Sequence, residues 1–331
     1  MKMQIMNIAL LTGGRSNERD RSLLTCSTVD LELRAMGHRT TIFDIAEPSF
    51  LGRVNDFDVA FLAVAGEYGE DGRLQGCLDT LRMSYTGSGV LASAAGMDKL
   101  MFKSIAQSAE IPVLPDIAVP STAPVIDVVE NILSNLKLPI LLKPTSDGCS
   151  NGISICYKRS ELEQVVEKIR RTSNRPFMAE EFLENATSVT VGVLEINGKT
   201  SALPALEIVP NGDLYDAKTK RTLGAAQYYC PARLSGEVSD AVRNLAVRCH
   251  ELLGCRSHSR VDFVVRQDEI FVLEINTLPG LSKQGNLATA ALANGISYRQ
   301  LLQAILNNAF TKSTSTDVPV DKVDELQADI A

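Results

Sequence analysis

The stretch SRVDFVVRQDEIFVLEINTLPG, residues 259–280, places two apolar runs on either side of a short polar turn. This pattern predicts an antiparallel β-hairpin. Side chains alternate across a strand, so residues two apart share a face. Arg260 and Asp262 therefore share a face of the first strand, and Glu274 and Asn276 share a face of the second. If the two faces coincide, two carboxylates, an amide and a guanidinium converge at one end of the hairpin.

This set of side chains is typical of a site that handles phosphate. Mg²⁺ takes hard oxygen ligands, commonly one or two carboxylates together with phosphate oxygens. An arginine beside the metal can stabilise the charge that develops on a transferring phosphoryl group. The alternative is a charged, solvent-facing side of a hairpin, because exposed charged faces are commoner than functional sites. The spacing alone leaves both interpretations open.

The tetrapeptide LEIN also occurs earlier, at residues 194–197, and leads there into Asn-Gly. Asn-Gly is a strong signal for a two-residue hairpin turn. No Asp and Arg pair precedes this copy at strand spacing. We therefore expect Glu195 and Asn197 to be exposed strand and turn residues.

Three further segments indicate phosphate or nucleotide binding. LLKPTSDGCSNGISI, residues 141–155, has Lys143 at the end of a strand, followed by a polar loop with two glycines. Such a loop lets backbone N–H groups approach phosphate oxygens, although it is not a GxxxxGK[ST] loop and is also compatible with an ordinary hairpin. MDKLMFK offers Lys99, which could equally be a solvated helix residue. MAEEFL, residues 178–183, could bind an adenine through its backbone and a carboxylate.

Composition narrows the class of protein. The 331 residues are 45% hydrophobic and 22% charged, with a net charge of −7, which is typical of an enzyme of two or three domains. The acidic balance argues against a nucleic-acid partner, and the absence of an apolar run of about 18 residues argues against a membrane partner. The N-terminal apolar run is interpreted as a strand rather than a signal peptide. Seven scattered cysteines without a CxxC motif favour a cytoplasmic location, and three histidines show no metal spacing.

The order of elements predicts an α/β protein. Near the N-terminus strands alternate with helices, which indicates a parallel sheet. Later segments follow a strand-turn-strand pattern, as in an α+β arrangement. We expect helices near residues 22–36, from about 93 to 110, and near 161–171, 237–253 and 297–307. The C-terminal stretch lacks apolar periodicity and is predicted to be a disordered tail.

Taken together, these motifs resemble the D-alanine–D-alanine ligase family of the ATP-grasp superfamily over residues 6–310. The motifs are LTGGRSNERDRS, AGEYGEDGRLQG, YTGSGVLASAAGMDK, LLKPTSDGCSNGISI, AEEFL, YDAKTK, QYYCPA, SRVDF and LEINTLPG. The resemblance implies a three-domain ATP-grasp fold. Its parts would be an N-terminal substrate-side α/β domain (1–94), a central ATP-grasp domain (95–184), a C-terminal catalytic ATP-grasp domain (185–312) and a tail (313–331).

The resemblance also implies an activity. Such enzymes use ATP to convert an amino acid's carboxylate into an acyl phosphate, which an amine then attacks to give an amide, ADP and phosphate. The implied cofactors are ATP and two Mg²⁺ ions, which Mn²⁺ could replace. The implied partners are a small amino-acid substrate and a second copy of the chain in a homodimer.

Site residues follow from the same resemblance. Asp262, Glu274 and Asn276 would hold the metal ions, and Arg260 would steady the acyl phosphate and the tetrahedral intermediate. Glu18 would receive the first substrate's ammonium. The nucleotide would be contacted by six residues: Lys99, Lys143, Lys220, Glu180, Glu181 and Leu183. Lys220 and Arg221 would lie on a loop that closes over the site, and Cys149 and Ser150 on the loop beside Glu18.

The sequence departs from the family on the substrate side. Ala65 replaces a histidine, and Cys149 replaces a serine that would hydrogen-bond to Glu18. Arg221 stands where a tyrosine usually follows the loop lysine. Gly285 and Asn286 replace a Ser-Leu pair that takes the second substrate's carboxylate, and Ser188 lies near a replaced ribose-contacting glutamate.

These departures predict a specialised ligase, as in antibiotic biosynthesis. Its acceptor would not be D-alanine or would be internal to the same molecule. An internal acceptor would resemble the cyclo-ligase that converts O-ureido-D-serine to D-cycloserine. One alternative is an ordinary D-alanine–D-alanine ligase of peptidoglycan synthesis. Another is an inactive ATP-binding regulator, which the retained Arg260 argues against.

Overall fold

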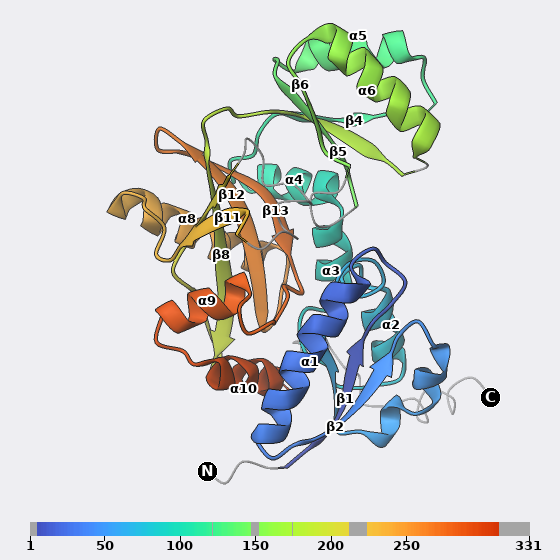
Figure 1. Ribbon diagram of the computed structural model, residues 1–331, viewed down its shortest axis with the longest axis vertical. Helices are drawn as coiled ribbons and strands as arrows, with labels where there is room; N and C mark the ends of the chain where they lie inside the picture. Colours follow the sequence, from blue (N-terminus) through green and yellow to red (C-terminus); the bar gives the residue numbers. More distant parts are fainter. Residues whose placement is uncertain (1–4, 121, 147–151, 174, 212–223, 311–331) are drawn as a thin grey trace, which may run out of the picture.

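The computed structural model describes residues 5–120, 122–146, 152–173, 175–211 and 224–310. Cys149, Ser150, Lys220, Arg221 and the expected C-terminal tail lie outside these residues. Within them the strands form three separate sheets, which Figure 1 shows as three lobes around α4. The α/β architecture expected from the sequence is confirmed.

The N-terminal lobe is built on a parallel sheet with the order β2-β1-β3. Its strands are β1 (Asn7–Thr12), β2 (Arg39–Asp44) and β3 (Val59–Leu62). Helix α1 (Arg19–Ala35) covers one face and α2 (Arg73–Thr80) covers the other, so β1 and β3 are buried on both sides. Burial on both faces explains why these strands are continuous apolar runs. Two short 3₁₀ helices, η1 (Pro48–Gly52) and η2 (Val54–Asp56), join β2 to β3.

The upper lobe in Figure 1 is a four-stranded antiparallel sheet with the order β4-β7-β5-β6. Its strands are β4 (Asp116–Val119), β5 (Ile140–Pro144), β6 (Ser154–Cys156) and β7 (Phe177–Glu181). Helices α5 (Val125–Asn135) and α6 (Arg159–Thr172) pack on one face and share an apolar cluster with the sheet. The other face of the sheet turns toward the rest of the molecule. Helix α5 was not predicted from the sequence.

The third sheet has the order β11-β10-β8-β12-β13, with β9 also pairing with β8. Its strands are β8 (Thr187–Ile196), β9 (Lys199–Ala202), β10 (Leu206–Pro210), β11 (Ala226–Tyr229), β12 (His258–Arg266) and β13 (Glu269–Asn276). Helix α8 (Gly236–Leu252) packs on one face. Helices α9 (Asn286–Ala293) and α10 (Tyr298–Asn308) pack between this sheet and α1. Strands β12 and β13 are the predicted antiparallel hairpin, which is confirmed.

The long helix expected from about residue 93 to 110 is two helices. Helix α3 (Val90–Met97) ends where Asp98 leaves the helical conformation, and α4 (Lys99–Ser108) begins at the next residue. The Asp98 side chain accepts a hydrogen bond from the Met101 N–H at 3.1 Å and so caps α4. The prediction of one helix was wrong because apolar periodicity continues across this cap.

Helix α4 lies between the upper lobe and the third sheet in Figure 1. Its Phe102 is fully buried with residues of β12, β13 and α8. The backbone N–H of Lys99 donates to the Thr145 carbonyl in the upper lobe at 3.0 Å. The helix therefore fixes these two parts of the molecule to each other. Domain boundaries near residues 94, 184 and 312 remain our proposal.

Candidate active site

A cleft of about 830 Å³ opens where the three sheets approach one another. Its walls come from the start of α1 and α4, from β5 and β7 of the upper lobe, and from β8, β12 and β13. Every candidate residue that the structure describes lines it: Glu18, Lys99, Lys143, Glu180, Glu181, Leu183, Arg260, Asp262, Glu274 and Asn276. The fold thus gathers segments that are far apart in the sequence into one site.

The hairpin brings its four polar residues together as expected. Arg260 lies directly opposite Asn276, and Asp262 lies directly opposite Glu274. Directly opposite residues of an antiparallel pair share a face. All four line the cleft, so the two faces coincide and the interpretation as a solvent-facing hairpin side is not supported.

Arg260 and Asp262 form a two-pronged ion pair. The Arg260 Nε and Nη2 atoms each donate to an Asp262 oxygen at 2.9 Å, and the Thr190 hydroxyl donates to Asp262 Oδ1 at 2.5 Å. Burial lowers the pKa of Arg260, but the charge and hydrogen bonds of Asp262 outweigh burial, and the pKa is raised. The guanidinium is therefore permanently charged and held in one orientation.

The other two hairpin residues have partners from neighbouring segments. The Lys99 Nζ atom lies 3.3 Å from Glu274 Oε2. The Asn276 side-chain oxygen accepts a hydrogen bond from the Leu278 N–H at 2.9 Å. This bond turns the chain at the Thr-Leu-Pro-Gly break. Asn276 is consequently fixed in the cleft by the turn that follows its own strand.

The upper-lobe wall contains a buried charge cluster. Lys143 donates to Glu180 at 2.9 Å, and Lys103, which the sequence analysis missed, donates to the other oxygen of Glu180 at 2.5 Å. Burial disfavours the charge of Glu180, but the two lysines outweigh it and hold the pKa of this carboxyl below its ordinary value. The Glu181 side chain accepts from the Lys137 N–H at 2.9 Å.

At the N-terminal side, Glu18 stands at the start of α1 and is 6% exposed. Its carboxylate lies 3.5 Å from Arg21. A Cβ atom on Gly66 would come within 2.8 Å of Glu18 Oε2, and Gly66 has a φ of +77°, so glycine is required there. This explains the glycine that follows Ala65.

Glu70 is a second carboxylate on this side and was not predicted from the sequence. It lines the cleft together with Glu18 and Arg21. Burial and the nearby charge of Glu18 raise the pKa of Glu70. The signal was present in the GEDG part of a quoted motif, where two acids, Glu70 and Asp71, sit between two glycines. This end of the cleft is thus suited to a cationic group.

Another part of the cleft wall is formed by the segment that leads into α9, which lies beside α1. Gly280, Ser282, Gly285 and Asn286 line it. Gly285 is the residue before the first turn of α9 and, as a glycine, has no side chain that could cap the helix. The first backbone N–H groups of a helix lack intrahelical partners and favour negative charge. The segment therefore retains some capacity to bind an anion.

The two LEIN copies differ, although not entirely as expected. Asn197 is exposed in the β8–β9 turn with a φ of +53°, which confirms its prediction. Glu195 is half-buried and lies 3.3 Å from His250 Nε2, so its prediction as an exposed residue was wrong. The second nitrogen of His250 is 2.8 Å from the Ser259 hydroxyl, beside Arg260 in the chain. The sequence pattern could not show this because His250 comes from α8.

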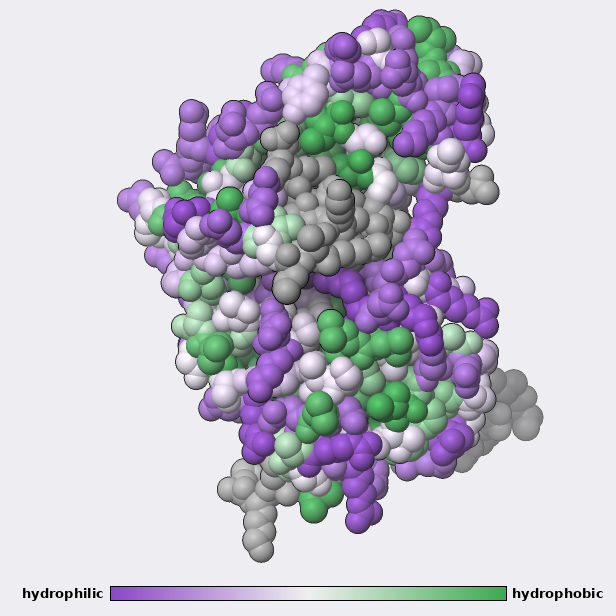
Figure 2. All heavy atoms as spheres, in the orientation of Figure 1, coloured by the Kyte–Doolittle hydropathy of each residue, from purple (hydrophilic) through white to green (hydrophobic). Residues whose placement is uncertain are grey.

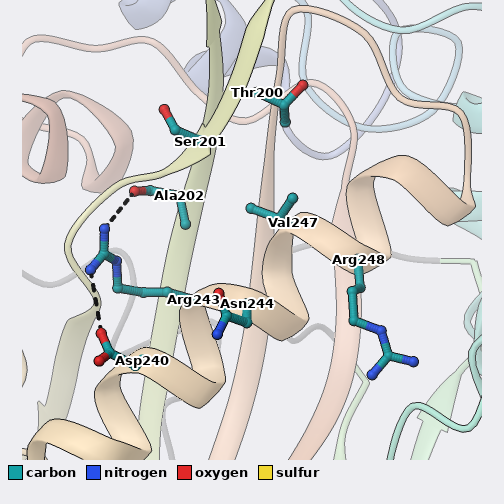
Figure 3. A pocket seen from close by; sticks show the side chains of 8 residues that line it. All are labelled: Thr200, Ser201, Ala202, Asp240, Arg243, Asn244, Val247 and Arg248. Carbon is teal, nitrogen blue, oxygen red and sulfur yellow. Dashed lines mark hydrogen bonds and ion pairs between the residues drawn. The ribbon is translucent and has the colours of Figure 1, made fainter.

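A second hollow, of about 640 Å³, lies between β9 and α8 (Figure 3). Arg243 donates to the Ala202 carbonyl at 3.3 Å and lies 3.7 Å from Asp240. Arg248 donates instead to the Ala109 carbonyl at 2.9 Å. The two guanidinium groups point away from each other in Figure 3. We assign this hollow no role.

Two features of the described residues bear on what the protein can bind. Three or more His, Cys, Asp or Glu side chains do not gather as a metal site there. The hairpin offers two carboxylates and one amide instead. No helix in this part of the chain is long and apolar enough to span a membrane. On the face shown in Figure 2, hydrophobic side chains form separate patches between hydrophilic ones.

The family model described as D-ala D-ala ligase C-terminus matches residues 105–307. A D-alanine–D-alanine ligase of Carboxydothermus hydrogenoformans is 36% identical over 309 residues, covering 91% of this chain and 97% of that protein. One from Anaeromyxobacter sp. is 38% identical over 309 residues, covering 92% and 97%.

Solved structures agree with these relatives. A crystal structure of D-alanine–D-alanine ligase from Bacillus anthracis complexed with ATP superposes with a TM-score of 0.78 at 26% identity, covering 92% of this chain and 97% of that one. A second structure of the Bacillus anthracis enzyme gives 0.79 at 28% identity.

Proposed function

This chain belongs to the D-alanine–D-alanine ligase family and is an ATP-dependent, ADP-forming ligase that makes carbon–nitrogen bonds; we propose that it activates an amino acid bound through Glu18. The observation that supports this proposal is the single cleft in which the hairpin acids, Arg260, two lysines and Glu18 all meet. An inactive regulator is no longer an alternative.

The chemistry explains why these groups are needed together. A carboxylate is a poor electrophile. Transfer of the γ-phosphoryl group of ATP to a carboxylate oxygen releases ADP and supplies a leaving group. The nitrogen of an amine then attacks the carbonyl carbon, the carbon–oxygen bond to phosphate breaks, and the amine loses a proton.

The hairpin residues fit a magnesium site. Asp262, Glu274 and Asn276 offer hard oxygen donors on one face, with room for phosphate oxygens in the cleft. When bound, Mg²⁺ neutralises phosphate charge. We propose two ions, which Mn²⁺ could replace.

The cations of the cleft have separate roles in this proposal. Arg260 carries a permanent charge and would stabilise the negative oxygens of the acyl phosphate and of the tetrahedral intermediate. Lys99 and Lys143 would bind phosphate oxygens of ATP. Glu180, Glu181 and Leu183 would lie around the adenine. We extend the proposal to Lys220, Arg221, Cys149 and Ser150 from the sequence alone, since they lie outside the described residues.

Glu18 would bind the ammonium group of the amino acid that is activated. It is buried beside Arg21, and Glu70 lines the same end of the cleft. Burial and the nearby Glu18 charge raise the pKa of Glu70, so this carboxyl binds a proton more readily than an exposed carboxyl does. A bound ammonium would lower that pKa, because opposite charges favour the ionised carboxylate.

We propose further that the acceptor amine is not D-alanine, or is internal to the substrate as in D-cycloserine synthesis. The observation that favours this is the wall before α9, where Gly285 contributes only backbone and Asn286 an uncharged amide. An internal acceptor brings no second carboxylate and would not need such a partner.

An ordinary D-alanine–D-alanine ligase is the second candidate. It is favoured by the names of the relatives and by the N-terminus of α9, whose backbone N–H groups could bind a carboxylate. A panel of amino acids, scored by phosphate release with products identified by mass, decides between the two. D-alanyl-D-alanine as the main product would establish the second candidate.

Assembly and location complete the proposal. We propose a homodimer, as the resemblance to the family implies. A cytoplasmic location is supported by six described cysteines that carry free thiols. The partner is a small amino-acid substrate rather than nucleic acid.

A further inference from the structure

Lys103 is a buried cation directly behind the wall of the cleft. Its side chain is 1% exposed. The ammonium lies 2.9 Å from the Leu114 carbonyl, 2.6 Å from Asp116 Oδ2 and 2.5 Å from Glu180 Oε2. An ammonium has three N–H donors, so these three oxygens match its bonding capacity. Lys103 is therefore held by the protein itself and does not line the cleft.

The Glu180 carboxylate is shared between Lys103 and a second lysine. Its Oε1 atom accepts from Lys143 Nζ at 2.9 Å, while Oε2 faces Lys103. Lys143 and Glu180 lie on adjacent strands β5 and β7, and both line the cleft. One carboxylate thus connects a cation behind the wall with a cation at its surface.

Charge balance makes Lys103 important for Lys143. Lys103 and Lys143 together supply two positive charges, and Asp116 and Glu180 supply two negative charges. Asp116 lies directly opposite Glu180 in strands β4 and β7. If Lys103 were removed, one lysine would face two carboxylates. Lys143 would then be drawn into the wall, away from a ligand in the cleft.

Helix α4 links this cluster to the catalytic hairpin. Lys99 precedes Lys103 by four residues, so both side chains lie on one face of the helix. Lys99 reaches Glu274 of β13 at 3.3 Å, whereas Lys103 reaches β4 and β7. The helix therefore forms ion pairs with both walls of the cleft, through Lys99 on one side and Lys103 on the other.

We propose that Lys103 is a positioning residue for nucleotide binding. By pairing with one oxygen of the Glu180 carboxylate, Lys103 offsets part of its negative charge, and the Lys143 ammonium on the other oxygen is then presented to the phosphates. The inference rests on the proposed function, in which ATP occupies this cleft. Lys103 acts only through Glu180 and Lys143 and touches no substrate.

The test is calorimetric binding of a non-hydrolysable ATP analogue with Mg²⁺ to the full chain. Lys103→Met and Lys143→Met should each weaken binding by about tenfold, the loss of one charge-assisted hydrogen bond. The double variant should bind within about twofold of Lys143→Met, because residues in one chain of contacts are not additive. Independent, multiplied losses would overturn the inference, since Lys103 would not then act through Lys143.

Two further variants guard against a general loss of structure. Asp116→Asn removes one negative charge from the cluster but keeps an oxygen that can accept from Lys103, so binding should be unchanged or up to about threefold tighter. Arg248→Met removes the bond to the Ala109 carbonyl at the end of α4 and should leave binding within about twofold. Tenfold weaker binding by either variant would contradict the inference, even if Lys103→Met does not fold.

The same experiment separates this inference from the proposed function. A wild-type chain that does not bind the analogue would refute the nucleotide site and the role of Lys103 with it. A wild-type chain that binds, with multiplied losses in the double variant, would refute only the role of Lys103.

Discussion

Asp262 and Glu274 lie directly opposite each other on the paired strands β12 and β13, with their side chains on the face that lines the cleft. Each is balanced by a different cation. Asp262 is paired with Arg260 of its own strand, and Glu274 with Lys99 from α4. A bulge follows Asp262 in the pairing of β12 with β13. The direct pairing of Asp262 with Glu274 is therefore confined to the end of the hairpin nearest the Thr-Leu-Pro-Gly segment. The two acids are thus placed by strand pairing rather than by a flexible loop.

This arrangement predicts that the acids act together on a metal. Asp262→Asn and Glu274→Gln should each lower the turnover number by about a hundredfold or more, because each removes anionic charge from the Mg²⁺ ligands. Phosphate release at increasing Mg²⁺ concentrations measures the effect. Circular dichroism should show an unchanged fold.

Glu269 provides a matched control on the same strand. It lies at the far end of β13, is 60% exposed and pairs with Arg266 at only 3.9 Å. Glu269→Gln should retain wild-type turnover. Equal losses in Glu269→Gln and Glu274→Gln would contradict the hairpin metal site.

Glu195, in the earlier LEIN copy, should matter for stability rather than for chemistry. Its carboxylate lies 3.3 Å from the buried His250, which contacts Ser259 on the face of β12 away from the cleft. Glu195→Ala should cost about 1–3 kcal/mol, because it leaves a buried hydrogen-bonding group without its partner. Glu195→Gln should cost less, since an amide oxygen can still accept from His250.

Thermal unfolding and turnover measured on the same samples separate the two effects. The midpoint should fall by a few degrees for the alanine variant, while turnover stays within about twofold of wild type. A large loss of turnover in a stable Glu195→Gln protein would show that the earlier copy also belongs to the active site.

The buried side chain of His258 leads us to expect that the fold loses stability in acid. It is 0% exposed, and burial lowers its pKa to about 3. The unfolded chain binds this proton near pH 6.5, so stability is complete above that value and is lost as the pH falls toward 3. Lowering the pH from 7.5 to 5.5 should cost about 1.4 kcal/mol through this one group.

The measurement compares wild type with His258→Asn. The fall in thermal midpoint between pH 7.5 and 5.5 should be smaller in the variant by a few degrees. His38→Asn is a second comparison, because burial lowers the pKa of that histidine as well. An identical pH dependence in wild type and His258→Asn would show that His258 is protonated equally in both states.

Helices and strands could be predicted from the sequence where the apolar residues recur with a single helical or strand period. The hairpin of β12 and β13 could be predicted because two apolar runs flank a polar turn, and strand alternation then assigned Arg260, Asp262, Glu274 and Asn276 to one face. The junction between α3 and α4 could not, since the cap at Asp98 interrupts the backbone without interrupting the apolar pattern.

The sequence could identify candidate site residues from the pattern of their own segments, but it could not show which distant residues they contact. Lys103 lies four residues after Lys99, but nothing in its segment shows that it pairs with Glu180, 77 residues later. Glu195 was misassigned for the same reason, because its partner belongs to α8. Long-range pairing of charges depends on tertiary structure and leaves no periodic signal.

The last prediction concerns the identity of the acceptor substrate. A D-alanine acceptor would bring a carboxylate to the wall before α9, where Gly285 and Asn286 offer no charged or hydroxyl partner and Ser282 offers a single uncharged hydroxyl. A buried carboxylate without a full partner costs several kcal/mol, which corresponds to a rate loss of about a hundredfold or more. D-alanine alone should therefore support little phosphate release, whereas the true substrate should support rapid release that Glu18→Gln weakens through a higher KM.

Restoring the missing pair tests this reasoning directly. In Gly285→Ser/Asn286→Leu, the new Cβ at position 285 would lie 3.0 Å from Ser282 Oγ and 3.1 Å from the Ser282 carbonyl, so the loop must yield by a few tenths of an ångström. The serine hydroxyl should then raise D-alanyl-D-alanine formation by about tenfold, the worth of one hydrogen bond to a charged group. Asn286→Leu alone, which adds no hydroxyl, should not. Efficient D-alanyl-D-alanine synthesis by the unmodified enzyme would instead mean that the backbone N–H groups of α9 are a sufficient partner, and that the chain is an ordinary member of its family.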